Sequence, residues 1–209
     1  MTTCALVAAS DFNAEHFMKM YRMELFDMVY AVDAGFAHLK AIDVSPDMAI
    51  GDFDSLGYVP QARRVVRHPV AKDKSDLELA LDRAKSRRHD EVYIYGALGG
   101  RLDHTIANMQ VCARFAEEGM IIYLVGLDQV IRILVGPDVY ELPLLEKGTV
   151  SVFSATNESH GVIERGMVYS IDDQTLTNRT TWGLSNEFKG EPAAVAVEDG
   201  TLFVFHPVV

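Results

Sequence analysis

The first two-thirds of the chain alternates short apolar segments with amphipathic ones, and this alternation limits the folds that it can adopt. We expect strands at Ala5–Ala9, Met28–Val32, Met48–Ile50, Val65–His68, Glu91–Tyr95 and Met120–Val125. We expect helices between them, at Ala14–Met23, Gln61–Arg64, Asp76–Arg87 and Asp103–Glu118. Strands that alternate with helices in this way predict an α/β fold with a mostly parallel, Rossmann-like sheet flanked by helices.

The last two of these helices carry the clearest signals. In the first of them, apolar residues recur at helical spacing, at Leu77, Ala80, Leu81 and Ala84. Ser75 and Glu78 form a capping box at its start. The second has one apolar face, at Ile106, Met109, Ala113 and Ala116. Both helices are therefore expected to cover the sheet with an apolar side.

The sequence changes character after about Gly126. Short β-rich segments follow one another between turn residues, and Glu198–Thr201 predicts a tight hairpin through Asp-Gly. We therefore predict an α/β domain over residues 1–130 and a small all-β sandwich over residues 131–209. A β-domain of this size is marginal alone and gains stability by docking against a partner.

The composition is that of a globular protein with an acidic surface. The chain has 209 residues, of which 49% are hydrophobic, and its formal net charge is −11. Nucleic acid and anionic membranes are poor partners for such a chain, because like charges repel. A single anionic ligand is still compatible, because a few local cations can hold it.

The cysteines, the histidines and the N-terminal segment limit the class of protein further. Cys4 falls in a predicted strand and Cys112 in a predicted helix, so we expect two buried, reduced thiols in a cytoplasmic protein. The histidines form no HxxxH or HxH pair, which argues against a zinc site. The segment MTTCALVAAS lacks the basic start of a signal peptide, and the apolar runs are too short to span a bilayer.

Acidic residues cluster where the predicted strands end. They are Asp33 in AVDAG, Asp52 and Asp54 in GDFDS, Asp73 and Asp76 in KDKSD, and Asp103 in GGRLDH. Ligands of open α/β sheets bind outside the carboxyl ends of the strands, so these side chains should converge on one crevice. Their mutual repulsion requires a positive partner, and divalent cations that carry phosphate suit carboxylate oxygens. The pattern predicts a Mg²⁺-dependent enzyme that acts on a phosphorylated substrate.

The acidic motifs also have plain structural interpretations. Asp52 and Asp54 would face one side of an extended backbone and grip a cation, but Asp and Gly are also common in turns. Asp73 and Asp76 would complement the dipole of a helix N-terminus, and Lys74 beside them would suit phosphate. The combination of motifs favours a functional site over a set of separate turns and caps.

The segment YGALGGRLDH joins a predicted strand to a predicted helix. Gly99 and Gly100 let backbone N–H groups approach phosphate at the start of the helix. Arg101 offers a guanidinium fork for phosphate oxygens. Asp103 is an alternative helix cap, and His104 is interpreted as a structural hydrogen-bonding residue.

The segment TTWGLSNEF is the unusual stretch of the β-rich part. It contains Trp182, which is the only tryptophan of the chain, with Ser185 and Asn186 in an expected turn. It is either a surface turn with a partly buried tryptophan or a lip that stacks on an aromatic ring and hydrogen-bonds it.

Taken in order, VDAG, GDFDS, KDKSDLELAL, GALGGRLDHTIANM and GLSNEF resemble the thiamin pyrophosphokinase family over nearly the whole chain. The resemblance implies an α/β domain followed by a β-sandwich. It implies transfer of a diphosphoryl group from ATP to the hydroxyethyl oxygen of thiamin, with thiamin diphosphate and AMP as products. It also implies a homodimer, in which thiamin binds between the α/β crevice of one subunit and the sandwich of the other.

The resemblance also implies roles for the matching residues. The Mg²⁺ ligands would be Asp52, Asp54 and Asp76. Asp33 would lie near the metal or the nucleotide, and the contacts to nucleotide and phosphates would be Gly35, Lys74, Gly99, Gly100 and Arg101. Catalysis would depend on Asp76, Asp103, Arg101 and Lys74, with Asp76 or Asp103 taking the hydroxyl proton. The contacts to thiamin would be Asp103 and, from the other subunit, Ser185, Asn186 and Trp182.

Three alternative functions stay open at this point. A diphosphokinase for a pterin alcohol would share the acidic clusters and differ in the acceptor pocket. A non-catalytic sensor of nucleotide or thiamin diphosphate should lack metal ligands, whereas all the acidic positions are present here. A metal-dependent phosphohydrolase would fit the glycine-rich loop but leave the C-terminal lip without a role.

Overall fold

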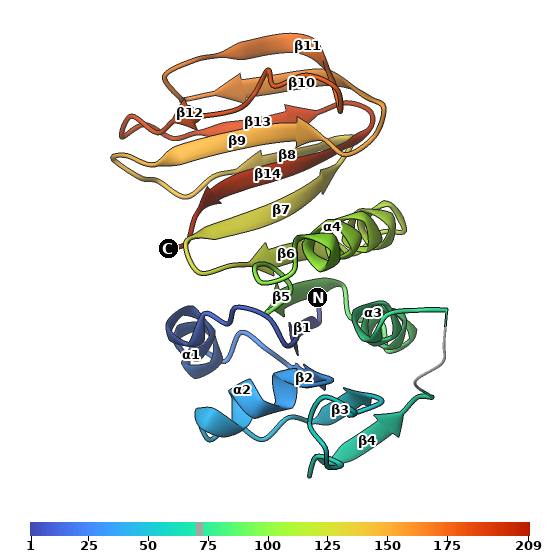
Figure 1. Ribbon diagram of the computed structural model, residues 1–209. Coiled ribbons are helices and arrows are strands. Elements are labelled where there is room, and N and C mark those ends of the chain that lie inside the picture. The colour runs from blue at the N-terminus through green and yellow to red at the C-terminus, as the bar shows by residue number, and fades with distance from the viewer. Residues whose placement is uncertain (70–72) are drawn as a thin grey trace. The chain divides into compact units, whose positions relative to one another are not determined.

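The computed structural model describes residues 1–69 and 73–209, and the chain divides into two compact units. The first unit contains residues 1–111 and 119–127, and the second contains residues 112–118 and 128–209. The protein is a mixed α/β molecule, with a parallel sheet in the first unit and two antiparallel sets of strands in the second (Figure 1).

Parallel strands form the sheet of the first unit. They are β1 (Thr3–Val7), β2 (Met28–Val32), β3 (Met48–Gly51), β4 (Arg64–Arg67), β5 (Glu91–Tyr95) and β6 (Ile121–Val125). Their order is β6-β5-β1-β2-β3-β4, and each adjacent pair is parallel. Every residue of β1 is buried between β2 and β5, which accounts for its largely apolar sequence.

The strand order places a topological switch beside β1. The chain runs from β1 through β2, β3 and β4, and then returns to the other side of β1 with β5 and β6 (Figure 1). The segments that leave the strands on the two sides of such a switch diverge, and a crevice forms at the carboxyl ends. The loops after β1, β2 and β5 therefore border the natural binding position of this sheet.

Side-chain caps define the starts of two helices. The helices are α1 (Ala14–Arg22), α2 (Gly35–Ala41), α3 (Asp76–Ser86) and α4 (Leu102–Glu117). Ser75 Oγ accepts a hydrogen bond from the Glu78 N–H at 3.2 Å, as the capping box predicts. Asn13 Oδ1 accepts from the His16 N–H at 3.0 Å in the same way. These bonds satisfy backbone donors that a helix start leaves without partners.

Two sequence-based expectations in this unit are wrong. The stretch Gln61–Arg64 forms no helix, and Arg64 instead begins the strand β4. Four residues directly after Pro60 are too few to sustain a helix, and pairing with β3 decides their conformation. Ile106 is 50% exposed, because α4 packs only through its second half. The buried residues of that half are Cys112, Ala113, Phe115 and Ala116.

Antiparallel strands build the second unit. One set, in the order β12-β9-β14-β7, contains β7 (Gln129–Val135), β9 (Thr149–Ser154), β12 (Asn186–Glu187) and β14 (Thr201–Pro207). The other, in the order β11-β10-β13-β8, contains β8 (Asp138–Glu141), β10 (Glu158–Arg165), β11 (Ile171–Thr177) and β13 (Ala194–Val197). One apolar cluster draws on both sets, and its members include Leu134, Val152, Val162, Leu176, Val195 and Val204.

The turn at Glu198–Thr201 differs from its prediction. Gly200 has the positive φ of +99° that the Asp-Gly signal requires. The turn does not close a hairpin, because β13 pairs with β10 and β8, whereas β14 pairs with β7 and β9. It links the two sheets, since the inward-facing residues of both strands join the same apolar cluster.

The cysteines behave as expected. Cys4 and Cys112 are fully buried and form no disulfide. Burial raises the pKa of both thiols above their ordinary value, so they stay protonated and unreactive. Within the part of the chain that the structure describes, no helix is both long and apolar enough to cross a membrane.

Buried histidines lie against tyrosine hydroxyls in both units. The paired atoms are 2.9 to 3.0 Å apart in His16–Tyr95, His89–Tyr30 and His206–Tyr140. Burial lowers the pKa of each of these histidines, because a charged ring would lose its hydration. For His89, burial outweighs the opposing effect of the Asp27 carboxylate.

We expect the free energy of unfolding to fall as the pH drops below 6.5, the ordinary pKa of histidine. A histidine whose pKa is lowered by folding stabilises the fold above that value, and this contribution is lost as the pH falls toward the folded-state pKa. His89→Gln keeps a polar group for Tyr30 but takes up no proton. Urea unfolding at about pH 7.5 and about pH 5.5 should show a smaller acid-induced loss in this variant than in wild type. Equal losses would contradict a neutral His89.

Candidate active site

A pocket of about 460 Å³ lies at the carboxyl ends of β1, β2 and β5, where the strand order predicts a crevice. Its lining from these strand ends includes Ala8, Ala9, Ser10, Asp33, Gly96 and Ala97. The helices α3 and α4 and the turns before them contribute Ser75, Asp76, Leu77, Gly99, Arg101, His104 and Asn108. The pocket is therefore assembled from segments that are far apart in the sequence.

Asp33, Asp52 and Asp54 form a carboxylate cluster at this pocket. One carboxylate oxygen of each residue lies within 4.8 Å of the other two. Asp33 lines the pocket, Asp52 is only 9% exposed and Asp54 is exposed. Like charges at this spacing repel one another unless a cation lies between them. In residues 1–69 and 73–209, this is the one group of acidic, histidine or cysteine side chains close enough to hold a metal ion.

Left-handed backbone brings the cluster together. Asp33 and Phe53 have φ values of +48° and +62°. The Phe53 N–H donates to Asp33 Oδ1 at 3.2 Å, and the Asp54 N–H donates to Asp52 Oδ1 at 3.1 Å. Of the two interpretations of GDFDS, the extended backbone is wrong and the turn agrees with the structure, because left-handed backbone at the buried Phe53 joins the carboxylates. Positive φ at such a bulky residue costs roughly 1–3 kcal/mol, and strain of this kind is typical of functional sites.

The glycine-rich turn orients an arginine at the start of α4. Gly99 and Gly100 have φ values of +83° and +61°. Arg101 donates to the Asp103 carboxylate from Nε at 3.1 Å and from Nη2 at 2.6 Å. Chiefly through this hydrogen bonding, Arg101 lowers the pKa of Asp103 to about 2. Both side chains are exposed, and Arg101 lines the pocket. The Asp103 carboxylate sets the orientation of its guanidinium group.

The start of α3 supplies the remaining charged residues of the predicted site. Asp76 lines the pocket. Lys74 Nζ lies 2.6 Å from Asp82 Oδ2 and 3.6 Å from Glu78 Oε1. Asp73 is exposed beside it. Asp33, predicted to lie near the metal or the nucleotide, lies with two of the predicted metal ligands, whereas the third, Asp76, lies in the pocket wall outside that group.

The remaining predicted residues lie in two places. Gly35 begins α2 against the end of β1, where a Cβ would lie 1.9 Å from the Val7 carbonyl oxygen. Trp182, Ser185 and Asn186 belong to the second unit. Trp182 is 54% exposed and Ser185 is exposed, whereas Asn186 is only 4% exposed.

Sequence reasoning missed several residues of the pocket lining. Ser10 directly follows the predicted strand Ala5–Ala9, and Ser55 is the last residue of GDFDS, so their positions beside a strand end and within a motif are the signals that would have found them. Asn108 lies one helical turn after His104, and its Nδ2 donates to the Ala97 carbonyl oxygen at 2.8 Å. His104 also lines the pocket, which its interpretation as a purely structural residue did not foresee.

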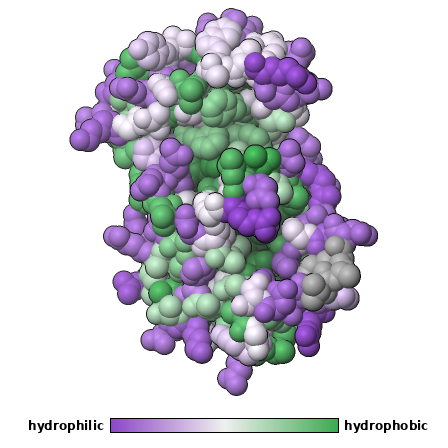
Figure 2. All heavy atoms as spheres, in the orientation of Figure 1, coloured by the Kyte–Doolittle hydropathy of each residue, from purple (hydrophilic) through white to green (hydrophobic). Residues whose placement is uncertain are grey.

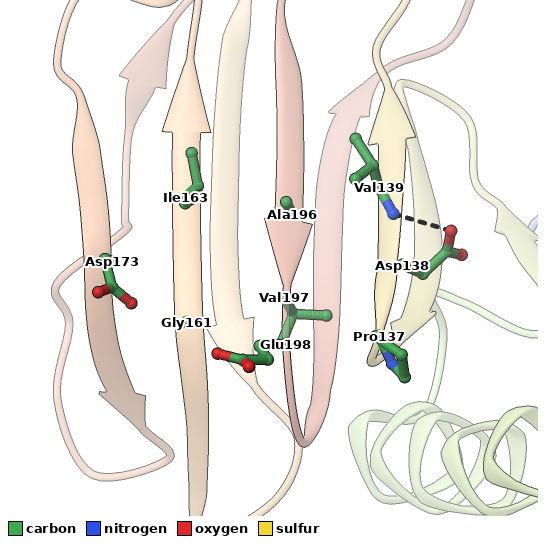
Figure 3. A pocket seen from close by; sticks show the side chains of 9 residues that line it. All are labelled: Pro137, Asp138, Val139, Gly161, Ile163, Asp173, Ala196, Val197 and Glu198. Atoms are coloured by element: carbon green, nitrogen blue, oxygen red, sulfur yellow. Dashed lines mark hydrogen bonds between the residues drawn. The ribbon is translucent and has the colours of Figure 1, made fainter.

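A second hollow, of about 540 Å³, lies on the outer face of the sheet β11-β10-β13-β8 (Figure 3). Its apolar lining includes Val139, Ile163 and Ala196. The acidic side chains at its border are Asp138, Asp173 and Glu198. It contains none of the predicted site residues, so the candidate active site is the pocket of the first unit.

A pocket at the carboxyl ends of parallel strands, with a carboxylate cluster and a glycine-rich turn before a helix, defines an α/β protein that binds phosphorylated ligands. The family model for the thiamin pyrophosphokinase catalytic domain matches residues 21–124. The chain is 30% identical over 165 residues to a thiamine pyrophosphokinase from Bacillus subtilis (strain 168), with 75% of this chain and 76% of that protein covered. The chain belongs to the thiamin pyrophosphokinase family, as its motifs predict.

Solved structures agree with this assignment. The structure of thiamine pyrophosphokinase from Bacillus subtilis has a TM-score of 0.83 at 24% identity and covers 99% of both chains. A thiamin pyrophosphokinase family protein from Enterococcus faecalis has a TM-score of 0.80 at 25% identity and covers 100% of both chains. The similarity extends over both units, so the chain has the fold of this family throughout.

Gly96→Ala should destabilise the protein more than Gly119→Ala. Both glycines have left-handed φ values, of +67° and +98°, where alanine is strained by roughly 1–2 kcal/mol. A Cβ at Gly96 would lie 2.2 Å from the Ala8 carbonyl oxygen in the pocket wall, whereas a Cβ at Gly119 would meet nothing within 4 Å. Urea unfolding of the two variants measures the difference. Equal losses would show that the close approach of β1 and β5 at Gly96 is not rigid.

Proposed function

We propose that this protein transfers the diphosphoryl group of ATP to the hydroxyl of thiamin, producing thiamin diphosphate and AMP. The carboxylate cluster at the pocket is the observation that carries the proposal, because phosphoryl transfer depends on positioning and on neutralisation of charge. Membership of the thiamin pyrophosphokinase family supports the identity of donor and acceptor. The reaction takes place in the cytoplasm, as the sequence predicts.

The donor atoms of the cluster suit Mg²⁺. Asp33, Asp52 and Asp54 offer carboxylate oxygens, which are the ligands that this hard cation prefers. Asp76 lines the same pocket and adds a carboxylate from α3. When bound, the ion neutralises charge on the triphosphate of ATP.

Arg101, Lys74 and the turn at Gly99 and Gly100 bind the phosphates. The turn presents backbone N–H groups at the N-terminus of α4, which favours anions. Arg101 is exposed and paired with Asp103, which directs its guanidinium group at the pocket, where its remaining N–H groups suit phosphate oxygens. Lys74 forms an exposed pair with Asp82, and exposed pairs contribute little to stability, so Lys74 turns from Asp82 to a phosphate at small cost.

Asp76 is the better candidate for the residue that takes the thiamin hydroxyl proton. A general base works best when its pKa lies near the operating pH. Arg101 holds the pKa of Asp103 at about 2, so Asp103 takes up a proton poorly in this arrangement. Asp103 is then the residue that orients Arg101 and the acceptor.

The second unit forms a β-sandwich that supplies the acceptor lip. In this division, residues 1–130 hold nucleotide and metal, and residues 131–209 bind thiamin and a second copy of the chain. The exposed Trp182 stacks on the thiamin ring, and the segment that contains Ser185 and Asn186 completes the lip. The exposure of an aromatic ring beside polar side chains supports this role.

A homodimer is the proposed assembly, with each active site shared between two subunits. The sheet β12-β9-β14-β7 carries the partly buried Phe153, Phe203 and Phe205 on the face opposite its apolar core. Figure 2 shows that polar side chains cover much of the visible surface, while a more apolar region lies over the strands of the second unit. An aromatic sheet face of this kind supports association of two copies.

The purified protein, incubated with ATP, Mg²⁺ and thiamin, should release AMP and an equal amount of thiamin diphosphate. Chromatography of the nucleotides and of the thiamin species measures both products. Formation of ADP instead would contradict diphosphoryl transfer. If AMP forms only with a pterin alcohol as acceptor, the assignment of thiamin is wrong.

Asp54→Asn should lower kcat/KM by at least about 100-fold, which is the upper range for loss of an outer-shell partner of a metal site. The fold should stay intact, because Asp54 is exposed. Asp43→Asn is the matched control, since Asp43 is exposed and has a left-handed φ of +56° that Asn tolerates, but lies in no site. Steady-state kinetics at several Mg²⁺ concentrations measure kcat/KM for wild type and both variants. Wild-type activity of Asp54→Asn would exclude the cluster as the metal site.

A further inference from the structure

A carboxylic acid lies in the apolar core of the second unit. Glu164 of β10 has no exposed surface. Its neighbours in the adjacent strands are Ile171 of β11 and Val195 of β13, and both are buried. The preceding residue, Ile163, points to the second hollow, on the outer face of the sheet β11-β10-β13-β8 (Figure 3). Glu164 therefore occupies an inward position that an apolar residue would ordinarily fill.

Glu164 contacts the segment GLSNEF through a hydrogen bond to Asn186. Its Oε2 accepts a hydrogen bond from Asn186 Nδ2 at 2.7 Å. Its Oε1 is buried and has no hydrogen-bond partner in the described chain. A Cβ at Gly183 would lie 3.5 Å from this second oxygen. The buried carboxyl group thus holds Asn186 directly and lies near the position of Gly183, three residues earlier.

Asn186 uses all of its hydrogen-bonding groups within the protein. Its Nδ2 also donates to the Tyr169 carbonyl oxygen at 2.8 Å. Its Oδ1 accepts from the N–H groups of Tyr169 and Glu187, at 3.0 and 2.9 Å. A side-chain amide has two N–H donors and one carbonyl oxygen with two lone pairs, and all of these are occupied. This arrangement suits a residue that fixes the shape of the segment.

The residues next to Asn186 are exposed. Trp182 and Leu184 are 54% and 53% exposed. Ser185 has a φ of +62°, and its N–H donates to Ser151 Oγ at 3.1 Å. The Gly183 carbonyl oxygen accepts from the Val152 N–H at 2.8 Å. From here on, the lip means the residues Trp182–Ser185. The hydrogen bonds to Ser151 and Val152 hold its backbone, and its side chains face the solvent.

We infer that Glu164 is a positioning residue, which sets the conformation of the lip through Asn186 and so controls the affinity for thiamin without contacting it. This inference rests on the proposed function of the lip as the acceptor surface. Removal of the carboxyl group would leave a buried amide donor of Asn186 without its partner, which a fold tolerates poorly.

The protonation of Glu164 agrees with this role. Burial raises the pKa of Glu164, and the hydrogen bond from Asn186 opposes the rise only in part. Burial therefore shifts the equilibrium of Glu164 toward the neutral acid, which an apolar core accommodates better than a carboxylate. A neutral amide of the same length should then replace it without loss.

Two substitutions at this position separate the hydrogen bond from the charge. Glu164→Gln keeps an oxygen that can accept from Asn186. Glu164→Leu suits the apolar core but removes the acceptor. Asn186→Ala breaks the same bond from the other side and serves as a second test should Glu164→Leu fail to fold.

Trp182 reports directly on the lip, because it is the only tryptophan in the chain. In Glu164→Leu we expect acrylamide to quench its fluorescence more efficiently, without any ligand present. We also expect the KM for thiamin to rise about tenfold, as for loss of one buried hydrogen bond, with the KM for ATP unchanged. Glu164→Gln should match wild type in all three measurements.

Val162→Ala is the matched control for general loss of stability. Val162 is fully buried on the same strand and on the same inward side as Glu164, but it makes no hydrogen bond to the lip. This variant should melt at a lower temperature, because a core cavity destabilises the fold. Its Trp182 quenching and its KM for thiamin should stay at wild-type values.

Folded Glu164→Leu or Asn186→Ala with wild-type Trp182 quenching and a wild-type KM for thiamin would overturn the inference. An equal loss in Glu164→Gln and Glu164→Leu would overturn the role of the hydrogen bond. Ser185→Ala tests the proposed function of the lip independently of Glu164, because Ser185 is exposed on the lip itself. If Glu164→Leu alters the quenching but neither variant changes the KM for thiamin, the lip is not the acceptor surface.

Discussion

The pairing of β1 with both β2 and β5 is the constraint on which the rest of the site depends. Because these strands are parallel, their carboxyl ends lie at one edge of the sheet, and the segments that leave them share the space there. Asp33 and Gly96 directly follow β2 and β5, and Ser10 follows β1 closely. Backbone hydrogen bonds of a buried sheet therefore position these residues, and the loops themselves need little regular structure.

The same edge gathers groups that oppose folding. Asp33, Asp52 and Asp54 repel one another, and Phe53 has a strained backbone conformation. Backbone N–H groups offset part of this cost, since they donate to Asp33 and Asp52. Burial of Phe53 fixes the turn between the two carboxylates. A cation that joins the three carboxylates removes the remaining repulsion, so binding of the ion and stability of this edge are linked.

Sequence patterns predicted the candidate site in outline because most of its features are local. The cap at Ser75 and the carboxylates of GDFDS are each visible within a few residues. The features that the sequence patterns missed depend on contacts between distant residues, or on backbone angles that the residue type does not indicate. Phe53 gives no sign of a positive φ, and Asn108 lies a turn beyond the glycine-rich motif. In the same way, Asp-Gly predicted a turn before Thr201, but the strands that pair beside it are chosen by the core.

The second unit shows why a motif alone does not assign the roles of its members. GLSNEF stands out because it places polar residues in a β-rich region, yet Ser185 is exposed while Asn186 is buried with its hydrogen bonds complete. The residue that completes this arrangement, Glu164, lies 22 positions earlier and outside any motif. Its sequence signal is an acid on the same inward side of a strand as Val162. A buried acid destabilises a core unless a specific partner offsets the cost. The partner found here is Asn186, which anchors the lip, so under the proposed function the determinants of acceptor binding would extend from the surface motif into the core.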